Sequence, residues 1–170
     1  MRRAAMLPGL MALLLGLVAL LPACGGKSVK GSLSVLMDMT YRDIDIVLGS
    51  SDATVRFTRP PGEDGLGEDL VLAVSARALR LPFAPDAGTP GLSFDLAEDI
   101  GGGVQRGSLA RNVLNDPRRT FPAILRGHLN FVNVPAAGQP TAGDFSVTFV
   151  LGEEFGDGRT LFDSFQGMVR

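Results

Sequence analysis

Acidic side chains are the first residues in this chain whose type and spacing could support chemistry. Four of them share one short stretch with two glycines: Glu63, Asp64, Glu68 and Asp69. Calcium binds flexible loops that offer several carboxylate oxygens, so these four are candidates for a calcium site. The stretch does not have the ligand spacing of an EF-hand loop. We therefore prefer to interpret it as the solvated tip of a hairpin.

Two further acidic groups could also bind a metal ion. The first consists of Asp95, Glu98 and Asp99. The second lies near the start of the chain and consists of Asp38, Asp43 and Asp45. The second group spans two predicted strands and could converge across a turn. Such residues more often form the wet face of a half-buried sheet. Neither group predicts a metal site on its own.

His128 is the only histidine. It precedes Leu129 and should point away from that residue, towards a polar face. A catalytic triad needs a nucleophile and an orienting acid aligned with the histidine. The chain has many serines, but none lies in a strained nucleophile elbow. We therefore expect a satisfied or exposed histidine, no catalytic residue and no enzymatic activity.

Arginines gather in the least regular part of the chain: Arg106, Arg111, Arg118 and Arg119. They could contact anionic lipid headgroups or a polyanionic surface glycan. We prefer ion pairs with nearby carboxylates. The glycine run 101–103 lacks the strand-to-helix setting of a phosphate loop, so it predicts a turn.

Charge and cysteine content exclude several functional classes. The chain has 170 residues and a formal charge of −2, with 16 cations and 18 acids. Without Arg2 and Arg3, the remaining 14 cations and 18 acids give −4, which argues against a nucleic-acid partner. A single cysteine excludes an intramolecular disulfide and a cluster of thiolate metal ligands.

The first 24 residues have the parts of an export signal. Arg2 and Arg3 precede an apolar run over residues 4–21. The last residue of this run, Leu21, begins the segment Leu21-Pro22-Ala23-Cys24. A positive start, an apolar centre and a small residue at the cut are typical of a cleaved signal peptide. An uncleaved signal anchor is the alternative, because the run is almost the roughly 20 residues that span a bilayer. Pro8, Gly9 and Gly16 interrupt the run and favour cleavage.

The last four residues of this segment resemble the lipobox of bacterial lipoproteins, with Pro22 as a departure at the position before Ala23. The resemblance covers only the leader. It implies a diacylglyceryl group on the Cys24 thiol, cleavage before that residue and acylation of the new amine. Gly25 in place of aspartate implies export to the outer membrane of a Gram-negative bacterium. Cleavage before Cys24 makes residues 1–23 the signal peptide. We expect a flexible tether over 24–30, and the length of the remainder predicts one domain over 31–170.

Period-two alternation between Gly, Pro and Asp clusters predicts an all-β domain. We expect strands near 31–38, 44–48, 55–57, 129–134, 145–151 and 159–169, with a short piece at 92–96 between a linker and the glycine turn. The turns between them suit an antiparallel β-sandwich or flattened barrel of seven to nine short strands. Residues 70–81 fit a helix or a buried strand, and their neighbours favour the strand. Helix should be scarce, with one turn near 108–116.

These observations predict a membrane-anchored envelope lipoprotein with a structural or protein-interaction role. An envelope protein is the expected partner. The alternative is a calcium-dependent or small-ligand-binding module, with its site in the loops at one end of the sandwich. Apart from lipid on Cys24 and the calcium of that alternative, we expect no cofactor.

Overall fold

The computed structural model describes residues 26–61, 67–79, 91–116, 120–150 and 158–170. Within these ranges there are ten strands and no helix, so the predicted all-β class is confirmed. The strands are β1 (Lys27–Ser28), β2 (Thr40–Tyr41), β3 (Asp43–Leu48), β4 (Ala53–Arg59), β5 (Asp69–Ala76), β6 (Leu92–Asp95), β7 (Gly107–Asn112), β8 (Ile124–Phe131), β9 (Pro140–Phe149) and β10 (Thr160–Met168). The ambiguous segment 70–81 is therefore the strand β5 over most of its length.

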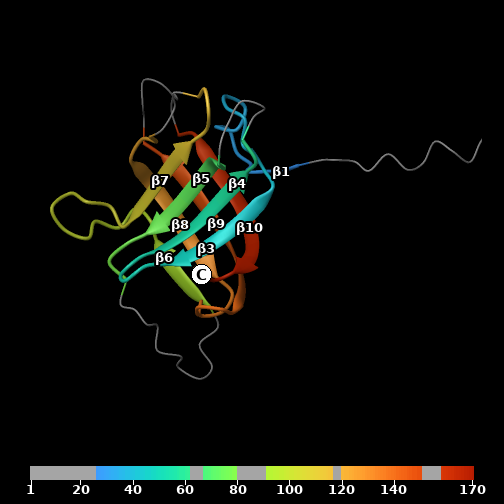
Figure 1. The fold of residues 1–170 in the computed structure, drawn as a ribbon. Helices are drawn as coiled ribbons and strands as arrows, with labels where there is room; N and C mark the ends of the chain where they lie inside the picture. Colours follow the sequence, from blue (N-terminus) through green and yellow to red (C-terminus); the bar gives the residue numbers. More distant parts are fainter. Residues whose placement is uncertain (1–25, 62–66, 80–90, 117–119, 151–157) are drawn as a thin grey trace, which may run out of the picture.

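The strands form two four-stranded antiparallel sheets, ordered β10-β9-β8-β6 and β3-β4-β5-β7, and a two-stranded sheet of β1 and β2. Figure 1 shows the two larger sheets stacked face to face, with the strands of one crossing those of the other. This is the β-sandwich arrangement, in which the inner faces of both sheets supply one core.

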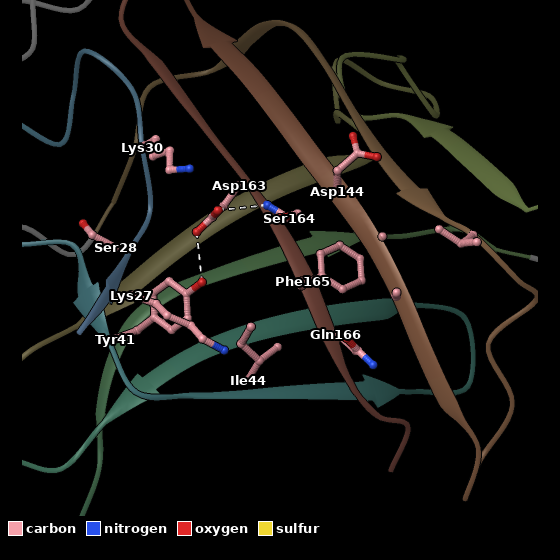
Figure 2. Close-up of a pocket in the computed structure, with 13 residues that line it drawn as sticks. Lys27, Ser28, Lys30, Tyr41, Ile44, Asp144, Asp163, Ser164, Phe165 and Gln166 are labelled. Carbon is pink, nitrogen blue, oxygen red and sulfur yellow. Dashed lines mark hydrogen bonds between the residues drawn. The ribbon is translucent and has the colours of Figure 1, made fainter. Parts of the chain in front are cut away.

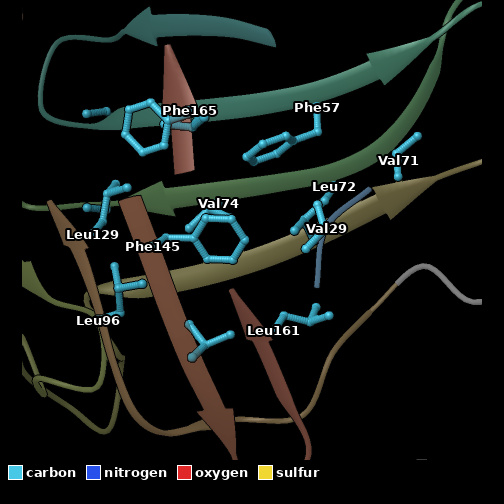
Figure 3. Packing of buried hydrophobic residues seen from close by; sticks show 14 of the residues in the cluster. Val29, Phe57, Val71, Leu72, Val74, Leu96, Leu129, Phe145, Leu161 and Phe165 are labelled. Carbon is cyan, nitrogen blue, oxygen red and sulfur yellow. The ribbon is translucent and has the colours of Figure 1, made fainter. Parts of the chain in front are cut away.

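The core lies between the two sheets and is built from alternate residues of each strand. In β9, Phe145 and Val147 are buried, and Ser146 between them is only partly covered. Phe57 of β4 lies between two aromatic rings, with its centroid 4.9 Å from that of Tyr41 and 5.6 Å from that of Phe145. Figure 3 shows Phe57 and Phe145 facing one another across the core. Each such side chain contributes roughly 1.5–3 kcal/mol by leaving water.

Backbone hydrogen bonds join the two large sheets at both edges. Beyond the end of β10, Arg170 N–H donates to the Ile46 carbonyl at 2.8 Å, and Leu48 N–H donates to the Arg170 carbonyl at 3.1 Å. At the opposite edge, Leu96 N–H donates to Gly127 O of β8, and Gly107 N–H donates to Leu96 O. These bonds occupy backbone groups that would otherwise be open to strand addition.

The expected tether over 24–30 is wrong for residues 27–30. Lys27 and Ser28 form β1, which pairs with β2. Val29 is fully buried, and Lys30 exchanges backbone hydrogen bonds with Phe162 of β10, at 3.0 and 2.8 Å. The segment is ordered because Val29 packs in the hydrophobic core and the backbone of Lys30 is hydrogen-bonded to that of Phe162. The domain therefore includes residues before Gly31.

Two local predictions are also wrong. The expected strand at 31–38 is a turn between β1 and β2, in which Leu33 is buried but Val35 is 76% exposed. Gly31 starts this turn with φ of +130° and packs against Thr160, where a side chain would not fit. The expected helical turn at 108–116 is largely the strand β7, because its residues pair with β5 and Arg111 is buried.

Candidate binding surface

The outer face of the β10-β9-β8-β6 sheet is lined mainly by polar side chains. The registers place them in two rows that cross all four strands: Phe162, Ser146, His128 and Asp95 in one, and Ser164, Asp144, Asn130 and Ser93 in the other. We call these eight residues the polar face. It forms because residues that alternate with a buried aromatic or aliphatic side chain must point to solvent.

Asp144 is the centre of the hydrogen bonding on the polar face. Its Oδ2 lies 3.0 Å from Nε2 of His128 and accepts a bond from Nδ2 of Asn130 at 3.1 Å. An ionised carboxylate only accepts, so His128 is the donor. The side chains of His128 and Asp144 are 45% and 51% exposed. The prediction that His128 faces the polar side of its strand is confirmed.

Ser146 is the register partner of His128, so a serine, a histidine and an aspartate lie on one face. In the described parts of the chain, however, the histidine bonds to Asp144 and no hydrogen bond joins it to Ser146. What the group offers chemically is a set of fixed donors and acceptors for hydrogen bonds.

Three adjoining hollows cover the polar face and the edge of β10. The largest, of about 640 Å³, lies at the seam between β1, β2 and β10, and Lys27, Tyr41, Asp163 and Gln166 are among its lining residues. Figure 2 shows this seam hollow, with Asp163 hydrogen-bonded to both Tyr41 and Ser164.

The other two hollows lie further across the sheet. One of about 360 Å³ includes Lys30, Phe162 and Asp144 in its lining, and one of about 460 Å³ includes Asp95, Arg126 and His128. Both reach Ser146. Neighbouring hollows share lining residues, and together the three extend from β1 to β6, so we call them the trough.

Tyr41 connects the seam hollow to the core. Its ring is buried against Phe57, and its hydroxyl donates to Oδ2 of Asp163 at 3.0 Å. Burial, together with the charge and hydrogen bond of Asp163, raises the pKa of Tyr41 far above its ordinary value. The phenol therefore stays protonated and remains a donor to this carboxylate.

Two of the four candidates for calcium binding are among the described residues. Glu63 and Asp64 lie outside the described residues, as does Cys24. Glu68 is exposed, whereas Asp69 is buried and accepts bonds from Leu114 N–H at 2.9 Å and Arg59 Nε at 3.3 Å. Within the described ranges no group of three His, Cys, Asp or Glu residues could hold a metal ion. The calcium site itself stays a prediction.

The other two acidic groups, whose members are all described, do not converge on a metal site. Asp38 pairs with Arg59, and Asp45 pairs with Arg170 at 3.1 Å. Asp95 and Asp99 each accept a hydrogen bond from the backbone N–H two residues later, at 2.9 and 2.7 Å. These two carboxylates thus stabilise turns in the connection between β6 and β7.

The preferred interpretation of the arginines is confirmed for the two that are described. Arg106 holds Glu98 through two nitrogens, at 2.9 and 2.8 Å, and Arg111 pairs with Asp116 at 3.2 Å. Arg118 and Arg119 lie outside the described residues. The predicted turn at 101–103 is confirmed by three glycines with positive φ.

The burial of Arg111 is a feature that sequence reasoning did not anticipate. It donates to Val71 O at 3.0 Å and to Asp38 O at 2.9 Å, and thereby joins β7 to β5 and to the turn before β2. Burial lowers the pKa of Arg111, and the hydrogen bond to Asp116 opposes that shift. Among the described residues its Nε is the one buried side-chain nitrogen or oxygen without a hydrogen-bond partner.

Sequence reasoning also missed Asp144, Asn130 and Phe162 as site residues. The alternation of polar residues with Phe145 and Val147 could have indicated an outward-facing set in β9. It could not indicate which strands lie beside β9.

The described residues contain no helix long and apolar enough to cross a membrane. The chain was compared with protein-family models, curated proteins and solved structures, and no match was found.

Proposed function

We propose that this chain is a bacterial lipoprotein, held by lipid on Cys24 in the outer membrane of a Gram-negative bacterium. The leader supports this, because its only cysteine stands directly after Leu21-Pro22-Ala23. Two or three acyl chains would give the stable anchoring that a single chain does not. Because the fold already includes Lys27, its Cα would lie at most roughly 11 Å from that of Cys24, three residues away.

The proposed role of the domain is a non-enzymatic interaction in the envelope, with the polar face as its binding surface. The observation that carries this proposal is the trough of three adjoining hollows across the polar face. Strand addition at a sheet edge is the less favoured mode, because backbone bonds already join the two sheets at both edges.

Small-ligand binding is a second candidate, favoured by the seam hollow. Its volume of about 640 Å³ lies in the usual range for ligand pockets. Its lining combines the apolar Ile44 and Phe165 with the polar Asp163 and Gln166. Under this proposal the ligand would enter beside the β1–β2 hairpin, and not in the end loops that the sequence suggested.

One experiment tests the anchor and the binding surface together. A photo-crosslinking residue replaces Ser164 on the polar face, and in a matched variant it replaces Ser50 in the turn after β3. Cells are irradiated, and the Cys24 peptide and the adducts are analysed by mass spectrometry. The proposal expects lipidated Cys24 and one dominant adduct from position 164 only. An unmodified Met1 terminus contradicts the anchor, and equal adducts from both positions contradict the binding surface.

A further inference from the structure

We propose that the polar face binds a neutral polysaccharide, with Phe162 as the stacking platform and Asp144 as the principal hydrogen-bond acceptor. The inference rests on the proposed function only in taking the polar face as the binding surface. It does not depend on the lipid anchor.

Phe162 is an exposed aromatic side chain set among polar groups. It is the third residue of β10, and it is 44% exposed. Its register partner on β9 is Ser146, and the next outward residue along its own strand is Ser164. An apolar contact patch would surround the ring with aliphatic side chains. A ring beside hydroxyl groups instead suits a ligand that has an apolar C–H face and a polar rim.

A sugar ring has that form. Its axial C–H bonds carry slight positive charge, and the face of an aromatic ring is negative, so the two attract when stacked. The hydroxyl groups around the sugar then need donors and acceptors close to the aromatic ring. The hollow of about 360 Å³ provides them, because Lys30, Asp144, Ser146 and Ser164 line it together with Phe162.

Asp144 is held in place by its neighbours with acceptor capacity left over. His128 and Asn130 both bond to Oδ2, and no hydrogen bond from a described residue reaches Oδ1. The carboxylate is therefore oriented before a ligand arrives, which lowers the entropic cost of binding. Oδ1 can accept from a sugar hydroxyl.

The other side chains of the trough indicate a neutral ligand. The carboxylates of Asp95, Asp144 and Asp163 are matched in number by the cations Lys27, Lys30 and Arg126, so the lining has no net charge that would favour a charged polymer. Protein interfaces are depleted in aspartate and serine, and these two residue types make up most of the polar face.

The length of the trough favours a polymer over a single sugar. Neighbouring strands are about 4.8 Å apart, so the face from β10 to β6 extends over roughly 14 Å. The hollow at Phe162 shares Ser146 with the hollow at His128, and it shares Lys30 and Asp163 with the seam hollow. Several consecutive sugar units could therefore be in contact with the protein at once.

The test uses the full chain, purified in detergent, and measures affinity by gel electrophoresis in soluble polysaccharides and by calorimetry. The probes are a β-glucan, an α-glucan, a mannan and a galactomannan, with dextran sulfate as the anionic comparison. Phe162→Ala and Asp144→Asn should each weaken binding of a neutral polysaccharide roughly tenfold, which corresponds to about 1.4 kcal/mol. Phe162→Trp should retain binding, because it keeps an aromatic face.

Leu125→Ala is the matched control, because Leu125 is 59% exposed and lies outside the three hollows. It should bind like the wild type. The proposal is overturned if the folded chain binds none of the neutral probes, or if Leu125→Ala and Phe162→Ala weaken binding equally. The proposal is also overturned if the chain binds dextran sulfate and none of the neutral polysaccharides. It is overturned as well if position 164 gives a single protein adduct and the chain binds no glycan. Loss of Cys24 lipidation would contradict the anchor and leave this result unaffected.

Discussion

The hydroxyl of Tyr41 donates a hydrogen bond to Asp163 at 3.0 Å, between residues that are 122 positions apart in the chain. This bond joins the β1–β2 hairpin to β10 at the opening of the seam hollow. It also places an aspartate on the inner side of a strand, where its register partner is the core residue Phe145. The hairpin and the seam are thus connected by one polar contact that can be tested directly.

We predict that Tyr41 ionises only at a pH well above the usual value of about 10 for tyrosine. The chain has one tyrosine and no tryptophan, so the phenolate absorbance reports on Tyr41 alone. Burial is the largest cause of the raised pKa, and the charge of Asp163 adds to it. Asp163→Asn should therefore lower the pKa only in part. Titration of the native protein near pH 10, as in the urea-unfolded chain, would contradict the structure.

The raised pKa of Tyr41 also makes the free energy of unfolding fall at alkaline pH. Because the folded pKa of Tyr41 is raised, its contribution is complete below about pH 10 and is lost as the pH rises towards the folded value. Urea unfolding at a series of alkaline pH values should therefore show a steeper loss in the wild type than in Tyr41→Phe. Parallel curves for the two proteins would contradict this prediction.

Asp38 should contribute stability that is lost in acid. Burial would raise its pKa, but the Thr40 N–H and the Arg59 guanidinium outweigh it and lower the pKa to about 2. A lowered folded pKa means that the contribution is complete above about pH 4 and is lost as the pH falls through about 2. The side chain is 58% exposed, so solvent screening limits the effect to under about 1 kcal/mol.

The check is urea unfolding of Asp38→Asn between pH 2 and pH 6. The variant should be less stable than the wild type at pH 6, and the difference should vanish towards pH 2. Asp43→Asn is the control, because Asp43 is exposed and lies at the start of the neighbouring strand β3. A difference that stays constant over this pH range would show that charge is not the cause.

Arg111 should be a major contributor to stability. Arg111→Met would leave the carbonyls of Val71 and Asp38 and the carboxylate of Asp116 without this donor. Removing one partner of a buried ion pair costs about 3–5 kcal/mol. Arg42→Met, at an exposed arginine, should change the free energy of unfolding by less than about 0.5 kcal/mol. Equal urea midpoints for the two variants would contradict the role of Arg111.

The sequence predicted best the features that depend on a single strand. Alternation identified Phe145, Val147 and Phe149 as one face of a strand, and all three are buried. It succeeded because a sheet with one wet face forces a period of two. The grouping of Asp144 with His128 and Asn130 could not be predicted in this way, since it depends on the register between β8 and β9.

The three local predictions that were wrong, for residues 27–30, 31–38 and 108–116, all failed because contacts between distant parts of the chain determine the structure there. Residues 27–30 looked like a tether because only Val29 is strongly apolar, and its burial depends on the β1–β2 hairpin and its contact with β10. Residues 31–38 show strand-like alternation, yet Gly31 turns the chain where it packs against Thr160. Residues 107–112 form a strand where a helical turn was expected, and the partners of the buried Arg111 come from distant segments.

Gly143 supplies the last prediction. This glycine lies inside β9, between Ala142 and Asp144. A Cβ there would overlap the carbonyl oxygen of Asn130 and lie 2.5 Å from Cζ of Phe165. Gly143→Ala should therefore destabilise the fold by about 3 kcal/mol, near the upper end of the usual effect of overpacking.

Gly102 provides the comparison for Gly143. It has a φ of +66° and no neighbouring atom within 4 Å of an added Cβ, so Gly102→Asn should change the free energy of unfolding by under about 1 kcal/mol. Urea unfolding of both variants measures the difference. Phe165→Leu would shorten the side chain that meets the new methyl group, and it should recover part of the loss if the ring is one cause. A Gly143→Ala protein as stable as the wild type would mean that β8 and β10 do not approach β9 this closely.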